Sequence, residues 1–293
     1  MLRSLTVQAP AKINLGLRVF PRRADGYHEI ESIFSTVNLC DTITVQVLDQ
    51  KDVCIVDCEG MVLPKENTFT KAYKAFCVLT GIRDGVHVHV TKRIPAGGGL
   101  GGGSSDSSSF IKSIDSLFGT QLSDSALLDI AGQVGSDVYF FTRRLVEENK
   151  VNSIGGGFTA IVRGRGEIIK PIENRNDFSI LLVFPGVHVS TKDAYDLVDA
   201  SLWLNAESKR SDEDLECLYK KPIREWFFSN DFTAPVAGRY PRIQQAMDEL
   251  GKAGADFVDM SGSGSTVFAV FEDRNKAEVA YRTLAMQWDS LLL

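Results

Sequence analysis

The residues with the clearest chemical potential form a glycine-rich run, PAGGGLGGGSSDSSS, over residues 95–109. Six of the seven residues from 97 to 103 are glycine, which adds no side chain to a core and loses much conformational entropy when ordered. Such a run offers bare backbone N–H groups that a ligand can approach closely. A helix N-terminus directly downstream would add further N–H groups and a positive dipole end. The following serines could cap that helix or hold a phosphate or its metal. The run therefore predicts an anion cradle for a nucleotide polyphosphate.

A flexible Gly/Ser linker is the simplest alternative for this composition. We favour the cradle because a strand-like segment precedes the run, a helical apolar pattern follows it, and Leu100 interrupts it as a buried anchor would. Gly97, Gly99 and Gly102 satisfy G-x-G-x-x-G, but no Lys-Ser/Thr pair follows as a Walker A loop requires. No acidic residue is placed as a dinucleotide-binding fold requires. The pattern predicts phosphate binding and leaves the chemistry open.

Three other features could contribute to a reaction. Asp137 lies inside the largely apolar residues 135–141; such an aspartate usually caps a helix, but facing a phosphate cradle it would be a candidate base or metal ligand. A second glycine/serine loop, residues 261–265, lies between two expected strands. Lys12 lies between two other expected strands, where a lysine is usually a solvated charge. These features do not by themselves define a reaction.

The elements that would position these residues mix strands with helices. Period-two and helical spacings predict extended segments over residues 5–9, 13–20, 30–39, 42–48, 53–58, 86–91, 159–163, 167–171, 180–184, 257–260 and 266–271. They predict helices over residues 67–80, 110–118, 190–204, 242–250 and 275–286, plus one capped by Ser123. Because the two types do not strictly alternate, we expect an α+β fold. Glycine becomes sparser after about residue 166, so we expect two domains, residues 1–166 and 167–293.

Composition narrows the class of protein. A 293-residue chain with a net charge of −6 is large enough for a substantial core and argues against nucleic acid as the main partner. Its five cysteines are odd in number and scattered, which favours free thiols over disulfides or zinc. We see no signal-peptide core and no apolar run long enough to cross a bilayer. We expect a cytoplasmic protein that binds small molecules but no membrane, as a monomer or weak homodimer.

Three motifs together resemble the GHMP kinases, a family of small-molecule kinases that includes galactokinase, homoserine kinase and mevalonate kinase. They are Pro-Ala-Lys-Ile-Asn at residues 10–14, the glycine run, and Met-Ser-Gly-Ser-Gly-Ser at residues 260–265, in the family's order over nearly the whole chain. The resemblance implies a two-domain fold with an N-terminal domain like ribosomal protein S5 and a ferredoxin-like C-terminal domain. It also implies that ATP and Mg²⁺ are cofactors.

The resemblance implies a role for each motif. Lys12 and Asp137 would be the catalytic pair, with Asp137 the general base and Lys12 stabilising charge on the acceptor oxygen and the moving phosphoryl group. Gly262 and Gly264 would support the ATP loop from the third motif, unless they only form a tight turn. Ser104 or Ser105 could touch Mg²⁺ through the nucleotide; the resemblance assigns no other metal ligand. The implied ATP-binding residues are Pro95, Ala96, Gly97, Gly98, Gly99, Leu100, Gly101, Gly102, Gly103, Ser104 and Ser105.

Within the family, Asp-Gly-Tyr-His at residues 25–28 resembles the branch whose acceptor is 4-diphosphocytidyl-2-C-methyl-D-erythritol, phosphorylated on its 2-hydroxyl in isoprenoid precursor biosynthesis. The implied cytidine-binding residues are Asn14, Tyr27, His28, Thr191 and Tyr195. Without the resemblance, Tyr27 and His28 would be interpreted as two residues that simply follow a turn, and Tyr195 as a core residue. The alternatives are a kinase for another small alcohol, such as homoserine or mevalonate, and a non-catalytic nucleotide-binding module.

The chain departs from the family pattern after Asp137. About fifteen additional residues, 142–156, precede the Gly-Arg-Gly-Glu hairpin and include Arg143, Arg144 and Glu147. Their polarity predicts a surface excursion that leaves the chemistry unaffected.

Overall fold

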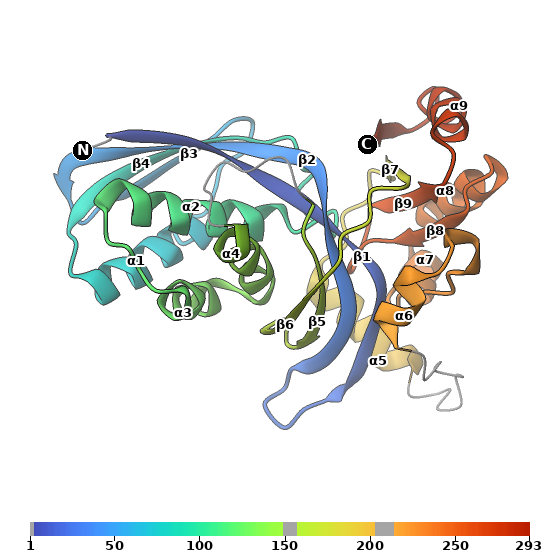
Figure 1. The fold of residues 1–293 in the computed structure, drawn as a ribbon, viewed down its shortest axis with the longest axis horizontal. Helices are drawn as coiled ribbons and strands as arrows, with labels where there is room; N and C mark the ends of the chain where they lie inside the picture. The colour runs from blue at the N-terminus through green and yellow to red at the C-terminus, as the bar shows by residue number, and fades with distance from the viewer. Residues whose placement is uncertain (1–2, 149–156, 203–213) are drawn as a thin grey trace.

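The computed structural model describes residues 3–148, 157–202 and 214–293. Its first half is built on a six-stranded sheet in the order β3-β4-β2-β5-β6, with β1 paired to β2 (Figure 1). All pairings in this sheet are antiparallel except β3 with β4. Its strands are β1 (Ser4–Arg22), β2 (His28–Lys51), β3 (Cys54–Cys58), β4 (Asp84–Thr91), β5 (Thr159–Gly164) and β6 (Ile168–Ile172).

Strands β1 and β2 are continuous where the sequence pattern predicted interruptions. The expected break over residues 10–12 is instead a register shift between Pro10 and Ala11, a β-bulge inside β1. The prediction of a loop around Lys12 is therefore wrong: Lys12 lies in β1, and its side chain is buried. A bulge re-aims the side chains beside it without ending the strand, and the alternation of apolar residues does not reveal it.

Four helices cover one side of this sheet: α1 (Thr68–Thr80), α2 (Gly102–Phe118), α3 (Asp124–Val134) and α4 (Ser136–Glu148) (Figure 1). The expected cap at Ser123 is confirmed, because its side chain accepts a backbone N–H group. Asn67 caps α1 in the same way, and Gly81 ends α1 with φ 72°. Apolar side chains of α1, α2 and α3 pack against β1, β2 and β4 in one core. This packing fixes α2 and α4, which carry the ends of the glycine run and Asp137.

Helix α2 begins at Gly102, inside the glycine run, and not at Phe110 as its apolar spacing predicted. Residues 102–109 contain no large apolar side chain, so hydrophobic periodicity could not detect this part of the helix. Gly101 occupies the N-cap position and no side chain caps the helix, so the predicted serine cap is wrong.

The second half is a four-stranded antiparallel sheet in the order β10-β7-β9-β8. Its strands are β7 (Ser179–Phe184), β8 (Phe257–Met260), β9 (Val267–Phe271) and β10 (Asp289–Leu292). The accompanying helices are α5 (Thr191–Leu202), α6 (Leu215–Lys220), α7 (Thr233–Arg239), α8 (Pro241–Lys252) and α9 (Arg274–Leu284), with a 3₁₀ turn at Ile223–Glu225. The mixed architecture confirms the α+β prediction.

The two sheets share a core. Ala11, Ile13 and Leu15 of β1 pack in one cluster with Leu182 of β7 and Phe268 of β9. Strand β6 follows the predicted domain boundary at residue 166, yet it pairs with β5 in the first sheet. Sheet membership changes between residues 172 and 179; the boundary at residue 166 stays a prediction.

The described part of the chain contains no helix long and apolar enough to cross a membrane. All five cysteines are free thiols, four of them half-buried and Cys217 exposed.

Candidate active site

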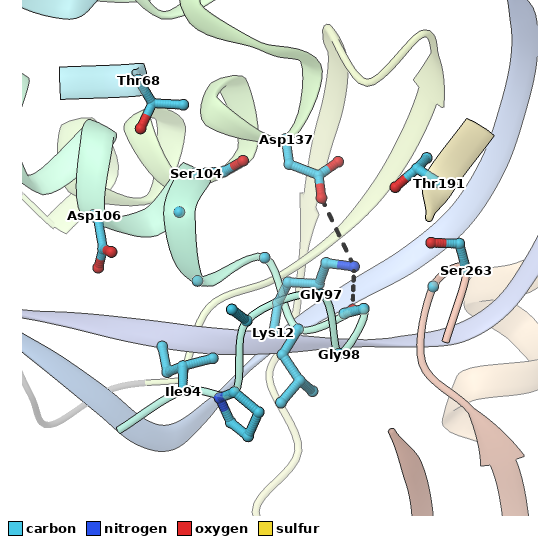
Figure 2. Close-up of a pocket in the computed structure, with 18 of the residues that line it drawn as sticks. Lys12, Thr68, Ile94, Gly97, Gly98, Ser104, Asp106, Asp137, Thr191 and Ser263 are labelled. Atoms are coloured by element: carbon cyan, nitrogen blue, oxygen red, sulfur yellow. Dashed lines mark hydrogen bonds and ion pairs between the residues drawn. The ribbon is translucent and has the colours of Figure 1, made fainter. Parts of the chain in front are cut away.

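A pocket of about 490 Å³ lies where the glycine run meets the third motif (Figure 2). Its lining brings together segments far apart in sequence: Lys12 and Asn14 of β1, residues 94–104, Asp137 of α4, Thr191 and Tyr195 of α5, and residues 262–264. A volume of this size is typical of sites for small ligands and cofactors. The three motifs selected from the sequence therefore line one cavity.

The glycine run is pressed against the third motif. Gly99 has φ 74°, and a Cβ atom there would lie 2.0 Å from the carbonyl oxygen of Ser261. Only glycine fits this contact. The Ser261 hydroxyl donates to the Gly99 carbonyl oxygen at 3.0 Å, and Thr266 N–H donates to Gly98 at 3.2 Å. The loop is thus held by the second sheet while its other face lines the pocket.

Lys12 is fixed at the centre of the pocket. Its Nζ donates to Asn14 Oδ1 at 2.6 Å and to the Gly99 carbonyl oxygen at 2.9 Å, and it lies 4.9 Å from the ring centroid of Phe34. Burial lowers the pKa of Lys12, and the carboxylate of Asp137 opposes that shift. The arrangement holds one ammonium group in a fixed position in front of the glycine run.

Asp137 faces Lys12 from the opposite wall. It lies in the first turn of α4, where the helix dipole favours a carboxylate, and does not occupy the N-cap position. Its Oδ2 lies 3.8 Å from Lys12 Nζ, and its side chain is 35% exposed. Figure 2 shows the two side chains pointing toward each other across the cavity. A base here can reach a ligand hydroxyl from the open side of the pocket.

The third motif is held in place by Asn230, which the sequence did not single out. Asn230 Nδ2 donates to the carbonyl oxygens of Met260 at 2.8 Å and Gly262 at 2.7 Å. Gly262 has φ 57°, and a Cβ there would meet Gly99 O at 3.1 Å and Lys12 Nζ at 3.3 Å. Gly264 lines the pocket beside it. The turn brings backbone, not side chain, next to the lysine.

Aromatic side chains gather at the end of the pocket formed by α5. Tyr195 lines the cavity, stacks on His28 at 5.0 Å between centroids, and meets Phe232 edge-on at 4.9 Å. Burial, with a smaller contribution from the Asp137 charge, raises the pKa of Tyr195 to about 12, so its hydroxyl stays neutral. His28 Nδ1 lies 2.7 Å from the Phe20 carbonyl oxygen, and Nε2 lies 3.3 Å from Asp199 Oδ1.

Tyr27 lies outside this pocket. Its exposed ring lies 4.9 Å below the guanidinium of Arg165, and both side chains line a separate hollow of about 230 Å³ with Tyr139 and Ser136. Of the five predicted cytidine-binding residues, Asn14, Thr191 and Tyr195 line the main pocket, while His28 lies behind Tyr195. Their binding roles stay predictions.

Comparison with known proteins agrees with this geometry. The GHMP kinase N-terminal domain model matches residues 67–144, and the GHMP kinase C-terminal model matches residues 216–289. The chain is 40% identical to 4-diphosphocytidyl-2-C-methyl-D-erythritol kinase of Treponema pallidum, over 98% of this chain and 97% of that protein. It is 37% identical to the enzyme of the same name from Thermotoga maritima, over 89% and 90% of the two chains.

The chain belongs to the GHMP kinase family. It is a small-molecule kinase with the two-domain fold of that family. A crystal structure of 4-(cytidine 5'-diphospho)-2C-methyl-D-erythritol kinase superposes with a TM-score of 0.78 at 28% identity, covering 98% of each chain. Homoserine kinase of Cytophaga hutchinsonii, at 19% identity and a TM-score of 0.66, shares the fold.

Sequence reasoning missed the other end of this GHMP kinase pocket. Beyond the glycine run, the cavity continues between the ends of β3 and β4 and the start of α1. It is lined there by Cys58, Met61, Leu63, Asn67, Thr68, Phe69, Val90, Lys92, Ile94 and Asp106. The charges of Lys92 and Asp106, which flank the glycine run, were an available signal. The apolar residues gave no such signal, because they line the pocket only where β3, β4 and α1 come together.

The predicted surface excursion over residues 142–156 is wrong for its first part. Helix α4 continues through Glu148, and Thr142, Arg144, Leu145 and Val146 are buried. Thr142 Oγ1 lies 2.9 Å from Ser108 Oγ of α2. These residues are part of the support for Asp137, because they hold α4 against α2. Residues 149–156 lie outside the described residues.

Proposed function

We propose that this GHMP kinase transfers the γ-phosphoryl group of ATP to the 2-hydroxyl of 4-diphosphocytidyl-2-C-methyl-D-erythritol, in isoprenoid precursor biosynthesis. One observation carries the proposal: Lys12 and Asp137 meet between the glycine run and the aromatic end of the pocket. A donor in the glycine run and an acceptor against α5 would therefore meet at this pair. The names of relatives at 32–40% identity support the choice of acceptor.

In the proposed reaction, Asp137 accepts the proton of the acceptor hydroxyl as its oxygen bonds to the γ-phosphorus. The bond from that phosphorus to the β–γ bridging oxygen breaks, and ADP leaves. Lys12 stabilises negative charge on the transferring group, and its fixed position means that little reorganisation accompanies the reaction. No covalent intermediate is required, because phosphoryl transfer depends mainly on positioning and electrostatics.

The glycine run would hold the ATP phosphates, using backbone N–H groups at the start of α2. Within the described part of the chain no group of three His, Cys, Asp or Glu residues could hold a metal alone. Mg²⁺ fits this site as a companion of the phosphates, because its preferred ligands are oxygens and it usually binds through substrate phosphates and few protein groups. When bound, it neutralises phosphate charge. Ser104 lines the pocket and could contact it, whereas Ser105 is fully buried and is not part of the lining.

The aromatic end would hold the cytidine part of the acceptor. Tyr195 offers a ring face that is braced by His28 and Phe232, and Thr191 offers a hydroxyl one helical turn away. A stacked pyrimidine would gain from this rigid aromatic surface. Asn14 would act here mainly through Lys12, because its Oδ1 accepts from Nζ and its Nδ2 donates to Ser32 Oγ at 3.2 Å.

A coupled ADP-release assay with Mg-ATP tests the proposal. It compares 4-diphosphocytidyl-2-C-methyl-D-erythritol with homoserine and mevalonate, with Asp137→Asn as the inactive control. Turnover with the cytidine substrate alone, lost in the variant, is the expected result. Turnover with another alcohol would overturn the acceptor. MgADP binding without turnover on any of the three would favour a non-catalytic module.

A further inference from the structure

A buried ionic cluster lies beside the glycine run, on the side away from Asp137. Lys92, just after β4, forms an ion pair with Asp41 of β2 and another with Asp106 of α2, the latter at 2.8 Å. Asp41 is fully buried, and Asp106 is 2% exposed. In Figure 2, Asp106 lies on the other side of the start of α2 from the Lys12–Asp137 pair. None of these three residues has a role in the reaction proposed above.

The cluster connects the two ends of the glycine run. At the first end, Asp41 Oδ1 accepts the backbone N–H of Arg93 at 2.6 Å and that of Ile94 at 2.8 Å. These residues lead directly into Pro95. At the second end, Asp106 lies one turn beyond Gly102 on α2. A Cβ atom on Gly102 would lie 3.3 Å from Lys92 Nζ, so the ammonium also packs against the start of this helix.

The charges of Asp41, Lys92 and Asp106 stabilise the contacts that join the two ends of the glycine run. Burial disfavours the Lys92 ammonium, but the two carboxylates outweigh that effect and raise its pKa. Burial also raises the pKa of Asp106 to about 7, against the attraction of Lys92. Removing one partner from such a buried group leaves an uncompensated charge or hydrogen-bonding atom. Two other titratable groups respond to these charges: Cys58 of β3, and Cys40, which precedes Asp41 on β2.

We propose that Asp41, Lys92 and Asp106 are positioning residues that clamp both ends of the glycine run and so set its affinity for the ATP phosphates. The proposal deepens the kinase function and rests on it for the identity of the nucleotide. The clamp acts through backbone geometry: Asp41 fixes the entry, Asp106 fixes the exit, and Lys92 joins them. Asp41 is not part of the pocket lining, so its effect on a nucleotide must pass through the loop.

The test uses the full-length enzyme and the variants Asp106→Ala, Asp106→Asn and Asp41→Asn. Lys112→Met is the matched control, because Lys112 forms a 2.9 Å ion pair with Asp115 on the same helix but does not line the pocket. The measurements are KM for Mg-ATP, KM for the acceptor, kcat, and the Kd of MgADP by calorimetry. Calorimetry needs no acceptor, so it tests the clamp even if the proposed acceptor is wrong.

We expect Asp106→Ala and Asp41→Asn to raise KM for Mg-ATP and Kd for MgADP about tenfold, while KM for the acceptor changes less than about threefold. Asp41 uses both carboxylate oxygens, one for Lys92 and one for the N–H groups of Arg93 and Ile94, so an amide there loses an acceptor. Asp106 uses only one oxygen, for Lys92, and an amide keeps it. Asp106→Asn should therefore stay within about threefold of wild type, as should Lys112→Met. If Asp106→Ala does not fold, Asp106→Ser carries the same expectation.

A contact of Asp106 with the phosphates themselves would give the opposite sign, because removing a nearby carboxylate would tighten binding of an anion. Tighter binding, or unchanged nucleotide affinity in both Asp106→Ala and Asp41→Asn, would overturn the clamp. A fall in kcat alone, with both KM values unchanged, would indicate a loss of folded enzyme and would also overturn it.

Discussion

Lys12 Nζ lies 2.6 Å from Asn14 Oδ1 but 3.8 Å from Asp137 Oδ2. The lysine is therefore held by its own strand and by the Gly99 carbonyl oxygen, and Asp137 is not its closest partner. A carboxylate that is not fully engaged keeps oxygen lone pairs for a substrate hydroxyl. The two proposed catalytic groups are close enough to act on one oxygen, yet each is positioned by a different element.

Replacing Asp137 by asparagine should lower kcat by roughly 10²–10⁴, the usual contribution of a general base. The amide matches the carboxylate in shape, so Kd for MgADP should change less than about threefold and the melting temperature should stay within a few degrees. Asp129→Asn, an exposed change on α3, is the control. Retention of more than a tenth of wild-type kcat would exclude Asp137 as the base.

Replacing Lys12 by methionine should lower kcat by roughly 10²–10³, as expected when a fixed group that stabilises transition-state charge is lost. Arginine should not restore activity, because the Lys12 side chain is buried and a guanidinium is larger than an ammonium group. Steady-state kinetics of both variants, beside the exposed Lys71→Met on α1, check this. Near-normal kcat in Lys12→Arg would show that only charge is needed.

Replacing Gly262 by alanine should lower kcat at least tenfold, because the new Cβ would meet Gly99 and Lys12 at 3.1 and 3.3 Å. Gly60 provides a matched control: its φ is 71°, but nothing lies within 4 Å of a Cβ there. Both substitutions carry the cost of a left-handed backbone, roughly 1–2 kcal/mol. If Gly262→Ala and Gly60→Ala had equal effects on kcat, the glycines of the third motif would only form a tight turn and would have no part in the reaction.

Replacing Tyr195 by alanine should raise KM for the cytidine acceptor about tenfold, because the stacking surface is lost, while KM for Mg-ATP stays within about threefold. Phenylalanine keeps the ring and should preserve the acceptor KM. If alanine and phenylalanine raised it equally, the hydroxyl would be the important group. Comparable increases in both KM values would instead indicate that α5 had moved.

Replacing Asp259 by asparagine should change how stability depends on pH. Asp259 is buried beneath the third motif, accepting from Thr233 Oγ1 at 2.6 Å and from Met260 N–H at 2.8 Å. Burial raises its pKa from 3.8 to about 7, so the folded state holds a proton that the unfolded state has released. Its contribution to stability is complete below pH 4 and is lost as pH rises through 7.

Urea unfolding at pH 5 and pH 8 checks the effect of this substitution. The asparagine does not titrate, so the variant should gain stability relative to wild type between the two pH values. Titration of the other groups affects both proteins equally and cancels when the unfolding free energy of wild type is subtracted from that of the variant. A difference in unfolding free energy that is independent of pH would contradict the raised pKa.

Much of the fold could be predicted because local patterns specify it. Ser123 marks a helix start through its side-chain hydroxyl, Gly81 marks a helix end through its left-handed backbone, and the strands of the second sheet alternate or run apolar over short stretches. The start of α2 could not be predicted in this way. Residues 102–109 are helical because their neighbours enclose them, although glycine and serine have weak helix propensity.

The parts of the candidate site built from glycines could be predicted, because glycine is required where the backbone is too close for a side chain. The residues whose role depends on burial could not be predicted. The positions of Gly99 and Gly262 follow from contacts too close for a side chain. The burial of Lys12 depends on Gly99, 87 residues away in sequence. Likewise, Asp41 and Lys92 meet only because β2 and β4 pair.

The shared core of the two sheets also affects how the active site arises during synthesis. Lys12 lies on the first strand, whereas Gly262 follows the eighth and packs directly against Gly99 and Lys12. A growing chain that has completed only β1 to β6 lacks the turn that encloses the lysine. We therefore expect the enzyme to become active only late in translation, and truncated products that retain the glycine run not to transfer phosphate.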